Sequence, residues 1–228
     1  MLVLVAVVLF ICCLLPAFLR WRKQQRILKE KLLSRLSKRS ERLLYSLEMV
    51  SDRYLTVETK VFFFEYLLDV VGQLTNANYQ SSFVLKKAYL DHTLSDLKSK
   101  QHILSKGRVG NQEQLDQIHG ALQCILREVR NIPENYGASR AIIRHHIALA
   151  RYAHALAYRD LLVKQAGMDM DNNKKGQALE KYRIALSIME KNASVTQSKR
   201  EMTRLKNKIQ DVENVLFAKK EKPESELK

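Results

Sequence analysis

Glycine, proline and cysteine are all scarce in this chain of 228 residues, which contains 7 glycines, 3 prolines and 3 cysteines. Runs with the alternating, β-branched pattern of strands are nearly absent as well. The composition therefore predicts a nearly all-helical protein. Cys12 and Cys13 lie inside an apolar run and Cys124 stands alone, so the sequence indicates no disulfide framework and favours a reducing compartment for the domain.

The sequence also lacks the motifs on which most predictions of enzymatic activity depend. It has no glycine-rich phosphate-binding loop and no serine in a nucleophile elbow. Its nearest approach to a catalytic carboxylate pair, Glu65 and Asp69, falls on an apolar helical segment that shows no sign of a cleft. We therefore predict no enzymatic activity, no catalytic residues and no cofactor.

Two patterns approach metal sites and fall short of them. Asp169 opens a segment with oxygen ligands at the spacing of a calcium-binding loop, but Lys174 stands where that loop needs a glycine. His145, His146 and His154 share one predicted helix, yet no two of them have the four-residue spacing that places both imidazoles on one face. We predict no metal site from either pattern.

Negative charge is the next scarcity, since 39 lysines and arginines outnumber 24 aspartates and glutamates and give a net charge of +15. Residues 1–19 carry no charge, and as a helix they would extend about 28 Å, close to the thickness of a bilayer core. Cations follow at once, with Trp21 placed like an interfacial aromatic residue. The positive-inside rule then predicts a single-pass membrane protein, with its N-terminus outside and its domain cytoplasmic, in the inner membrane of a bacterium.

The segment 20–42 contains ten lysines and arginines against two glutamates. We predict that the start of this segment contacts the membrane or another anionic surface. The residues that would make this contact are Arg20, Trp21, Arg22, Lys23 and Arg26. Nucleic acid is the alternative anionic partner, although Trp21 is the only aromatic residue in the segment on which a base could stack.

From residue 33 onward, apolar side chains recur at alternating spacings of three and four, as in a coiled-coil seam or a packed helix. Two interpretations stay open. The stripe could pair with a second copy, or it could pack within the monomer, since Leu44 and Phe62 widen the apolar surface beyond a two-stranded seam. The residues of the self-association seam would be Leu33, Leu36, Leu43, Leu47, Val50 and Val57.

We divide the chain into four parts. These are a transmembrane anchor (1–19), an exposed basic helical stalk (20–45), a helical domain (46–218, with a sub-boundary at 133–138) and a disordered charged tail (219–228). Within the domain, periodicity and turn residues predict helices at about 46–72, 81–105, 112–131, 139–165, 177–191 and 198–218.

Ala178, Tyr182 and Ala185 follow the alanine–aromatic–alanine spacing of the second helix of a tetratricopeptide unit, and residues 152–153 match the first helix loosely. The last three helices thus resemble one tetratricopeptide hairpin over about a quarter of the chain. The resemblance implies a helical hairpin that binds a partner helix or peptide. The sequence departs from the repeat in its long linker, 166–176, and in the lack of a second copy.

These features together predict a membrane-anchored helical scaffold or adaptor that recruits a protein partner and associates with itself, with no small-molecule substrate. The alternative is a membrane-tethered protein that binds nucleic acid or anionic lipid through its basic stalk. A loss of affinity with rising salt would support the alternative, because counterion release dominates such binding.

Overall fold

The computed structural model describes residues 2–99, 107–133 and 136–218, with side-chain positions from Phe18 to Phe217 within those ranges. Every regular element in this part of the chain is helical, which confirms the predicted all-helical fold class. The elements are α1 (Leu2–Met49), α2 (Val57–Asn76), the 3-10 turn η1 (Val84–Lys86), α3 (Lys87–Ser99), α4 (Gln112–Arg130), α5 (Arg140–Asp171), α6 (Lys175–Glu190) and α7 (Thr196–Ala218).

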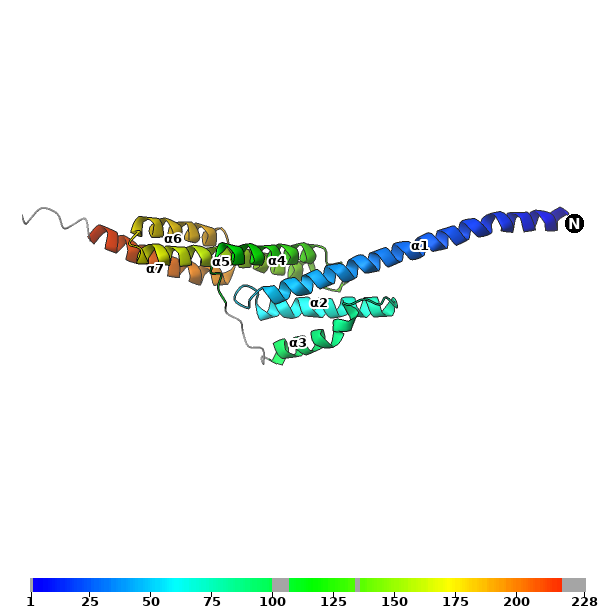
Figure 1. Cartoon of the computed structure of the whole chain (residues 1–228), viewed down its shortest axis with the longest axis horizontal. Helices are drawn as coiled ribbons and strands as arrows, with labels where there is room; N and C mark the ends of the chain where they lie inside the picture. Colours follow the sequence, from blue (N-terminus) through cyan, green and yellow to red (C-terminus); the bar gives the residue numbers. More distant parts are fainter. Residues whose placement is uncertain (1, 100–106, 134–135, 219–228) are drawn as a thin grey trace, which may run out of the picture.

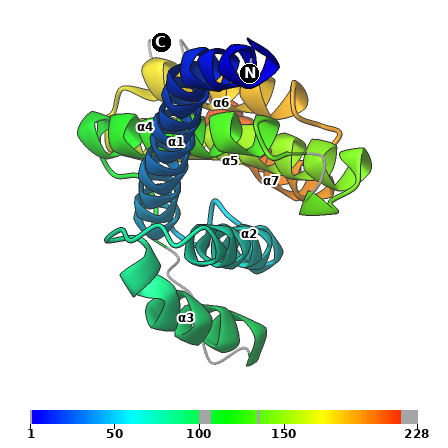
Figure 2. The same cartoon turned by 90° about the vertical axis from the view of Figure 1, so that its right-hand side faces the viewer.

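The helices form an elongated molecule in which α1 and α7 point to opposite ends (Figure 1). Helices α4 to α7 pack in sequence order, each against the next, while α1 packs against both α2 and α4. Helix α2 lies between α3 and the rest of the bundle, as Figure 2 shows from the end of the molecule. The first half of α1 projects beyond the bundle, so only its second half takes part in the core.

Polar side chains cap the N-termini of three helices. Thr56, Asn111 and Ser139 each accept a hydrogen bond from a backbone N–H three residues ahead, and so cap α2, α4 and α5. Asn78 and Asn173 adopt positive φ angles just after α2 and α5. Asparagine adopts this left-handed conformation more readily than most residues, so the chain can change direction sharply where each helix ends.

One continuous cluster of buried apolar side chains runs from α1 through to α7. Leu43 and Leu47 of α1 meet this core together with Phe63 of α2 and Ile125 of α4, all of them 1 % exposed or less. The connection between α4 and α5 covers the expected sub-boundary at 133–138, yet these two helices stay packed against each other.

The long apolar stripe of residues 33–71 is divided between two helices. Helix α1 ends at Met49, a turn follows, and α2 then packs back against α1. The expected boundary between stalk and domain at residue 46 also differs from the structure, because α1 already contributes half-buried Leu33 and Leu36 to the bundle.

The predicted transmembrane anchor at residues 1–19 and the localisation derived from it need correction. In the part of the chain that the structure describes, no helix combines the length and the apolar character that crossing a bilayer requires. The predicted single-pass membrane protein with a cytoplasmic domain is therefore contradicted. The described side chains of α1 are rich in charge from Arg20 onward, and those of residues 1–17 lie outside the described set.

The predicted linker at 166–176 is mostly helical. Helix α5 continues to Asp171, which leaves only residues 172–174 between α5 and α6. Asp169, the first position of the calcium-loop pattern, forms an ion pair with Lys181 of α6 instead. The predicted tail at 219–228 and the end of the predicted helix 81–105 lie outside the described residues.

A buried ionic cluster fixes the turn between α1 and α2 to the rest of the bundle. The carboxylate of Asp160 in α5 accepts hydrogen bonds from Arg53 and from Arg159, the latter at 2.7 Å. The hydroxyl of Tyr54 donates to the same carboxylate at 3.1 Å and accepts from the backbone N–H of Val109 at 2.9 Å. The turn after α1 and helix α5 therefore meet at one carboxylate, and Tyr54 connects the segment of Val109 to them.

The cluster extends to α7, because Arg159 also forms an ion pair with Glu201 at 2.6 Å. Burial raises the pKa of Asp160, but hydrogen bonds and charges from the two arginines outweigh it and hold the pKa below its usual value. Burial likewise raises the pKa of Tyr54 to about 12, so the phenol stays protonated and available as a donor.

We expect Asp160→Asn to lower the free energy of unfolding by about 3 kcal/mol or more, because it leaves buried arginines without their anionic partner. The control is Asp96→Asn on α3, because the carboxylate of Asp96 pairs with the exposed His92. Loss of this surface pair should lower the free energy of unfolding by only about 0.5 kcal/mol. Urea unfolding followed by circular dichroism measures both. Equal losses for the two variants would show that the buried cluster does not stabilise the fold.

Candidate functional site: a groove between α1 and α4

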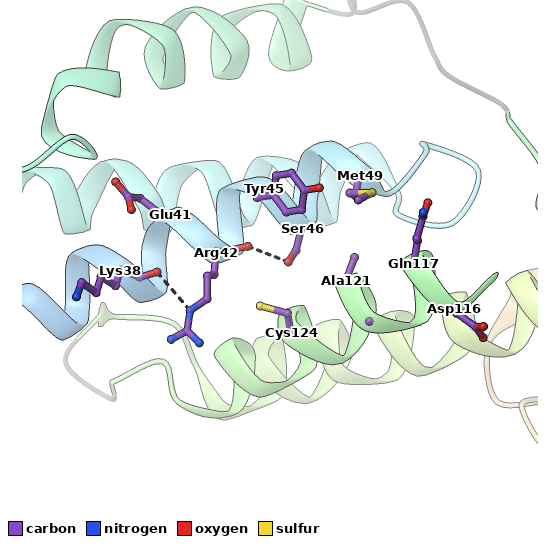
Figure 3. A pocket seen from close by; sticks show the side chains of 11 residues that line it. Lys38, Glu41, Arg42, Tyr45, Ser46, Met49, Asp116, Gln117, Ala121 and Cys124 are labelled. Carbon is purple, nitrogen blue, oxygen red and sulfur yellow. Dashed lines mark hydrogen bonds between the residues drawn. The ribbon is translucent and has the colours of Figure 1, made fainter. Parts of the chain in front are cut away.

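A groove of about 860 Å³ opens between α1 and α4 (Figure 3). One wall comes from α1 and the other from α4, and the helices run antiparallel there, so that Lys38 lies towards Cys124 and Met49 towards Gln117. The lining residues are Lys38, Glu41, Arg42, Tyr45, Ser46, Met49, Asp116, Gln117, Gly120, Ala121 and Cys124.

Small side chains on α4 leave room for the groove. Gly120, Ala121 and Cys124 occupy neighbouring positions on one side of α4. A Cβ atom added at Gly120 would meet no other atom within 4 Å, so the space above this residue is open. On the facing wall, Tyr45 is 62 % exposed and Met49 is 37 % exposed, and both present apolar surface to the groove.

The two ends of the groove differ in charge. Lys38 and Arg42 lie at one end and Asp116 at the other (Figure 3). Arg42 donates from Nε to the backbone carbonyl of Lys38 at 3.4 Å, so the Arg42 side chain lies back along α1 towards Lys38. Glu41 is turned away from the groove, where its carboxylate accepts a hydrogen bond from Ser82.

An ion pair beside the groove fixes its walls. Arg39 of α1 donates to the carboxylate of Glu128 in α4 at 2.6 Å, and the Glu128 side chain is almost fully buried. The hydrogen bond to Glu128 raises the pKa of Arg39, so the guanidinium stays charged. The groove is thus preformed by packing and does not depend on a mobile loop.

The composition of the groove can be compared with that of known recognition surfaces. It combines apolar walls with charged groups at its rim, the usual composition of a recognition surface. Across the described residues, no three histidine, cysteine, aspartate or glutamate side chains gather closely enough to hold a metal ion.

The residues predicted to contact an anionic surface lie elsewhere on α1. Arg20, Trp21, Arg22, Lys23 and Arg26 are all exposed, and they belong to the part of α1 that projects from the bundle. They stand at least three helical turns before Lys38, so the structure does not bring them into the groove. Their contact with an anionic surface stays a prediction.

Most of the predicted self-association seam lies on the side of α1 opposite the groove, while Val50 follows the end of α1 and Val57 begins α2. Leu43, Leu47 and Val50 are each 1 % exposed or less and belong to the core. Leu33, Leu36 and Val57 are partly buried and pack against the same core. The seam is thus already occupied by contacts within one chain, as the second interpretation of the stripe expects.

Four histidines of the described chain form ring contacts outside the groove. His119 of α4 stacks on His154 of α5 with ring centroids 3.5 Å apart, and burial lowers the pKa of both. His146 stacks on Phe62 at 4.2 Å and lies 3.4 Å from the hydroxyl of Thr59. Burial, followed by the charge of His145, lowers the pKa of His146 to about 4.

No family model matches this chain, and neither a curated protein nor a solved structure is detectably similar to it. The groove therefore has to be interpreted from its own geometry and chemistry.

The groove is not apparent from the sequence, because its walls are about seventy residues apart in the chain. A partial signal was present on α1. Tyr45 and Met49 lie four residues apart on the side opposite the seam, where a solvated helix would carry polar residues. A second signal, the small residues of α4, becomes meaningful only once the neighbouring helix is known.

We expect the fold to lose stability as the pH falls from 6.5 towards 4. The unfolded chain takes up a proton on His146 near pH 6.5, whereas the folded pKa of about 4 resists protonation, so acid favours unfolding in this window. His146→Phe keeps a ring against Phe62 and should reduce the loss at pH 5 by about 1–2 kcal/mol.

Urea unfolding at pH 7 and pH 5 measures this effect. The control His92→Phe replaces an exposed histidine of α3 and should follow the wild-type profile. A pH dependence that is the same in the His146→Phe variant and the wild type would contradict the prediction.

Proposed function

We propose that this protein is a helical adaptor that binds a partner protein in the groove between α1 and α4. The observation that carries the proposal is the open, apolar groove itself, whose walls hold large exposed side chains that no segment of the described chain covers. Exposed apolar surface rimmed by charge is typical of an interaction site.

Two further features support an adaptor. The partly buried Arg39–Glu128 pair holds the two walls of the groove in place, so a partner meets a rigid surface and little entropy is lost in ordering it. Helix α1 then continues past the bundle and could extend the contact area. The size of the groove is also within the range of sites that accept a side-chain cluster from a partner helix.

The α5–α6 pair offers a second place where partner binding can be considered. Ala178, Tyr182 and Ala185 are at most 4 % exposed, so the residues that resemble a tetratricopeptide helix pack inward. The resemblance stays a prediction, and it supplies no exposed groove comparable to that between α1 and α4. We therefore base the proposed function on the latter.

The first experiment locates the partner. Benzoylphenylalanine placed at Tyr45, inside the groove, should crosslink one defined protein in the cell of origin. The same amino acid placed at Tyr158, an exposed tyrosine of α5, serves as the control position. The proposal is wrong if the two positions crosslink the same set of proteins or if Tyr45 crosslinks none.

The second experiment fills the groove without disturbing the bundle. Gly120→Leu places a side chain into open space and removes a helical glycine, so we expect binding of the crosslinked partner to fall at least tenfold while stability is kept or rises by about 0.5–1 kcal/mol. Isothermal titration and thermal unfolding measure the two quantities.

Gly72→Leu on α2 is the matched control. Its added side chain also meets no atom within 4 Å at Cβ, but it lies outside the groove. This variant should bind the partner as the wild type does. Equal affinities for the Gly120 and Gly72 variants would overturn the proposed function.

A further inference from the structure

We propose that the groove receives an amphipathic helix with acidic flanks from the partner protein, and that this helix continues from the groove along the exposed side of α1. The inference rests on the proposed function and adds the chemistry of the partner. It is carried by one set of residues, which we call the outer face of α1. These are Lys31, Arg35, Lys38, Arg42, Tyr45 and Met49.

The outer face is continuous along one side of a single helix. Its six residues follow one another at spacings of four, three, four, three and four, the spacings that keep side chains in one row. All six are exposed, whereas the core-facing row of α1 is buried. From Lys31 to Met49 the row extends about 27 Å, which corresponds to a partner helix of about five turns.

The composition of the row changes along its length. Lys31, Arg35, Lys38 and Arg42 are cationic, and the row then ends with Tyr45 and Met49 above the apolar part of the groove. A partner with apolar anchors at one end and carboxylates along the rest would match both halves. Asp116 at the Met49 end of the groove disfavours carboxylates there and so fixes which half of the partner is acidic.

A second copy of this chain fits the row poorly. It would bring its own four cations against those of the first, and the whole chain carries a net charge of +15. Like charges in close contact disfavour such a pairing, so a partner of opposite charge is favoured.

Nucleic acid would be complementary to only part of the outer face of α1. Phosphates could pair with the cations, but a phosphate backbone has no apolar groups to cover Tyr45, Met49 and the open space above Gly120. A helix with apolar anchors can occupy both the cationic and the apolar part, in the way that amphipathic helices fill grooves on other proteins.

Three fluorescent peptides of twenty residues provide the probe. They share leucines at spacings of three and four, and they carry Glu, Gln or Lys at the flanking positions of the half that faces the cations. Anisotropy titrations against the full chain, at low and high salt, should give the order Glu, then Gln, then Lys, with at least a tenfold difference in Kd between Glu and Lys peptides at low salt.

Two double variants test which cations are responsible. Lys38→Glu with Arg42→Glu should reverse the order of the peptides. Lys199→Glu with Arg200→Glu changes the net charge equally, but on exposed residues of α7, and should keep the wild-type order. If both double variants behave alike, general charge attraction is responsible and the inference is wrong.

Groove filling separates this inference from the proposed function. Gly120→Leu should raise the Kd of the Glu peptide at least tenfold. An unchanged Kd would show that the peptide does not bind in the groove. Equal affinities for the three peptides, or no binding by any of them, would overturn the acidic-helix inference while leaving the crosslinking result at Tyr45 intact. Displacement of the Glu peptide by a single-stranded oligonucleotide whose binding is insensitive to Gly120→Leu would assign the cations to nucleic acid instead.

Discussion

The carboxylate of Asp160 is the point on which the arrangement of the helices depends. It is buried between Arg53 and Arg159 and also receives the hydroxyl of Tyr54, so it attaches the turn after α1 to the middle of α5. This attachment fixes the C-terminal end of α1, and therefore the direction in which α1 runs along α4. A buried carboxylate with two cations tolerates little displacement, because any separation leaves charges without partners in a medium of low dielectric constant. The groove is a consequence of that fixed crossing.

Helix α1 serves two surfaces at once. One row of its side chains, including Leu43 and Leu47, fills the core, and the row on the opposite side faces solvent beside α4. Because an α-helix is stiff over this length, the core contacts that hold the second half of α1 also determine where its projecting first half points. The Arg39–Glu128 ion pair adds a constraint next to the groove. If the two walls separated, the buried carboxylate of Glu128 would lose its cationic partner.

The sequence predicts the helical class and most helix ends because these depend on local chemistry. Periodicity and turn residues identify α4 and the start of α5, whose caps in the structure are Asn111 and Ser139. The turn at 50–56 is different. It contains neither glycine nor proline, and its hydrogen bonds to Gly107, Val109 and Asp160 come from distant segments, so periodicity alone runs straight through it. The predicted membrane anchor at residues 1–19 was wrong, because no helix in the described part of the chain is long and apolar enough to cross a bilayer. The groove was beyond prediction because α1 and α4 are adjacent only in the folded chain.

The charge on the projecting half of α1 affects how this helix associates with other copies of the chain. A long exposed helix with apolar side chains such as Trp21 and Leu32, each more than half exposed, would ordinarily associate with copies of itself. Here the same segment carries a cation at nearly every turn, so two copies repel one another when their apolar surfaces approach. Repulsion of like copies and attraction of an acidic partner are then two effects of one charge pattern. Neutralising the cations should therefore have two effects: weaker binding of an acidic helix and stronger self-association. A measurement of affinity for the acidic helix would detect only the first of them.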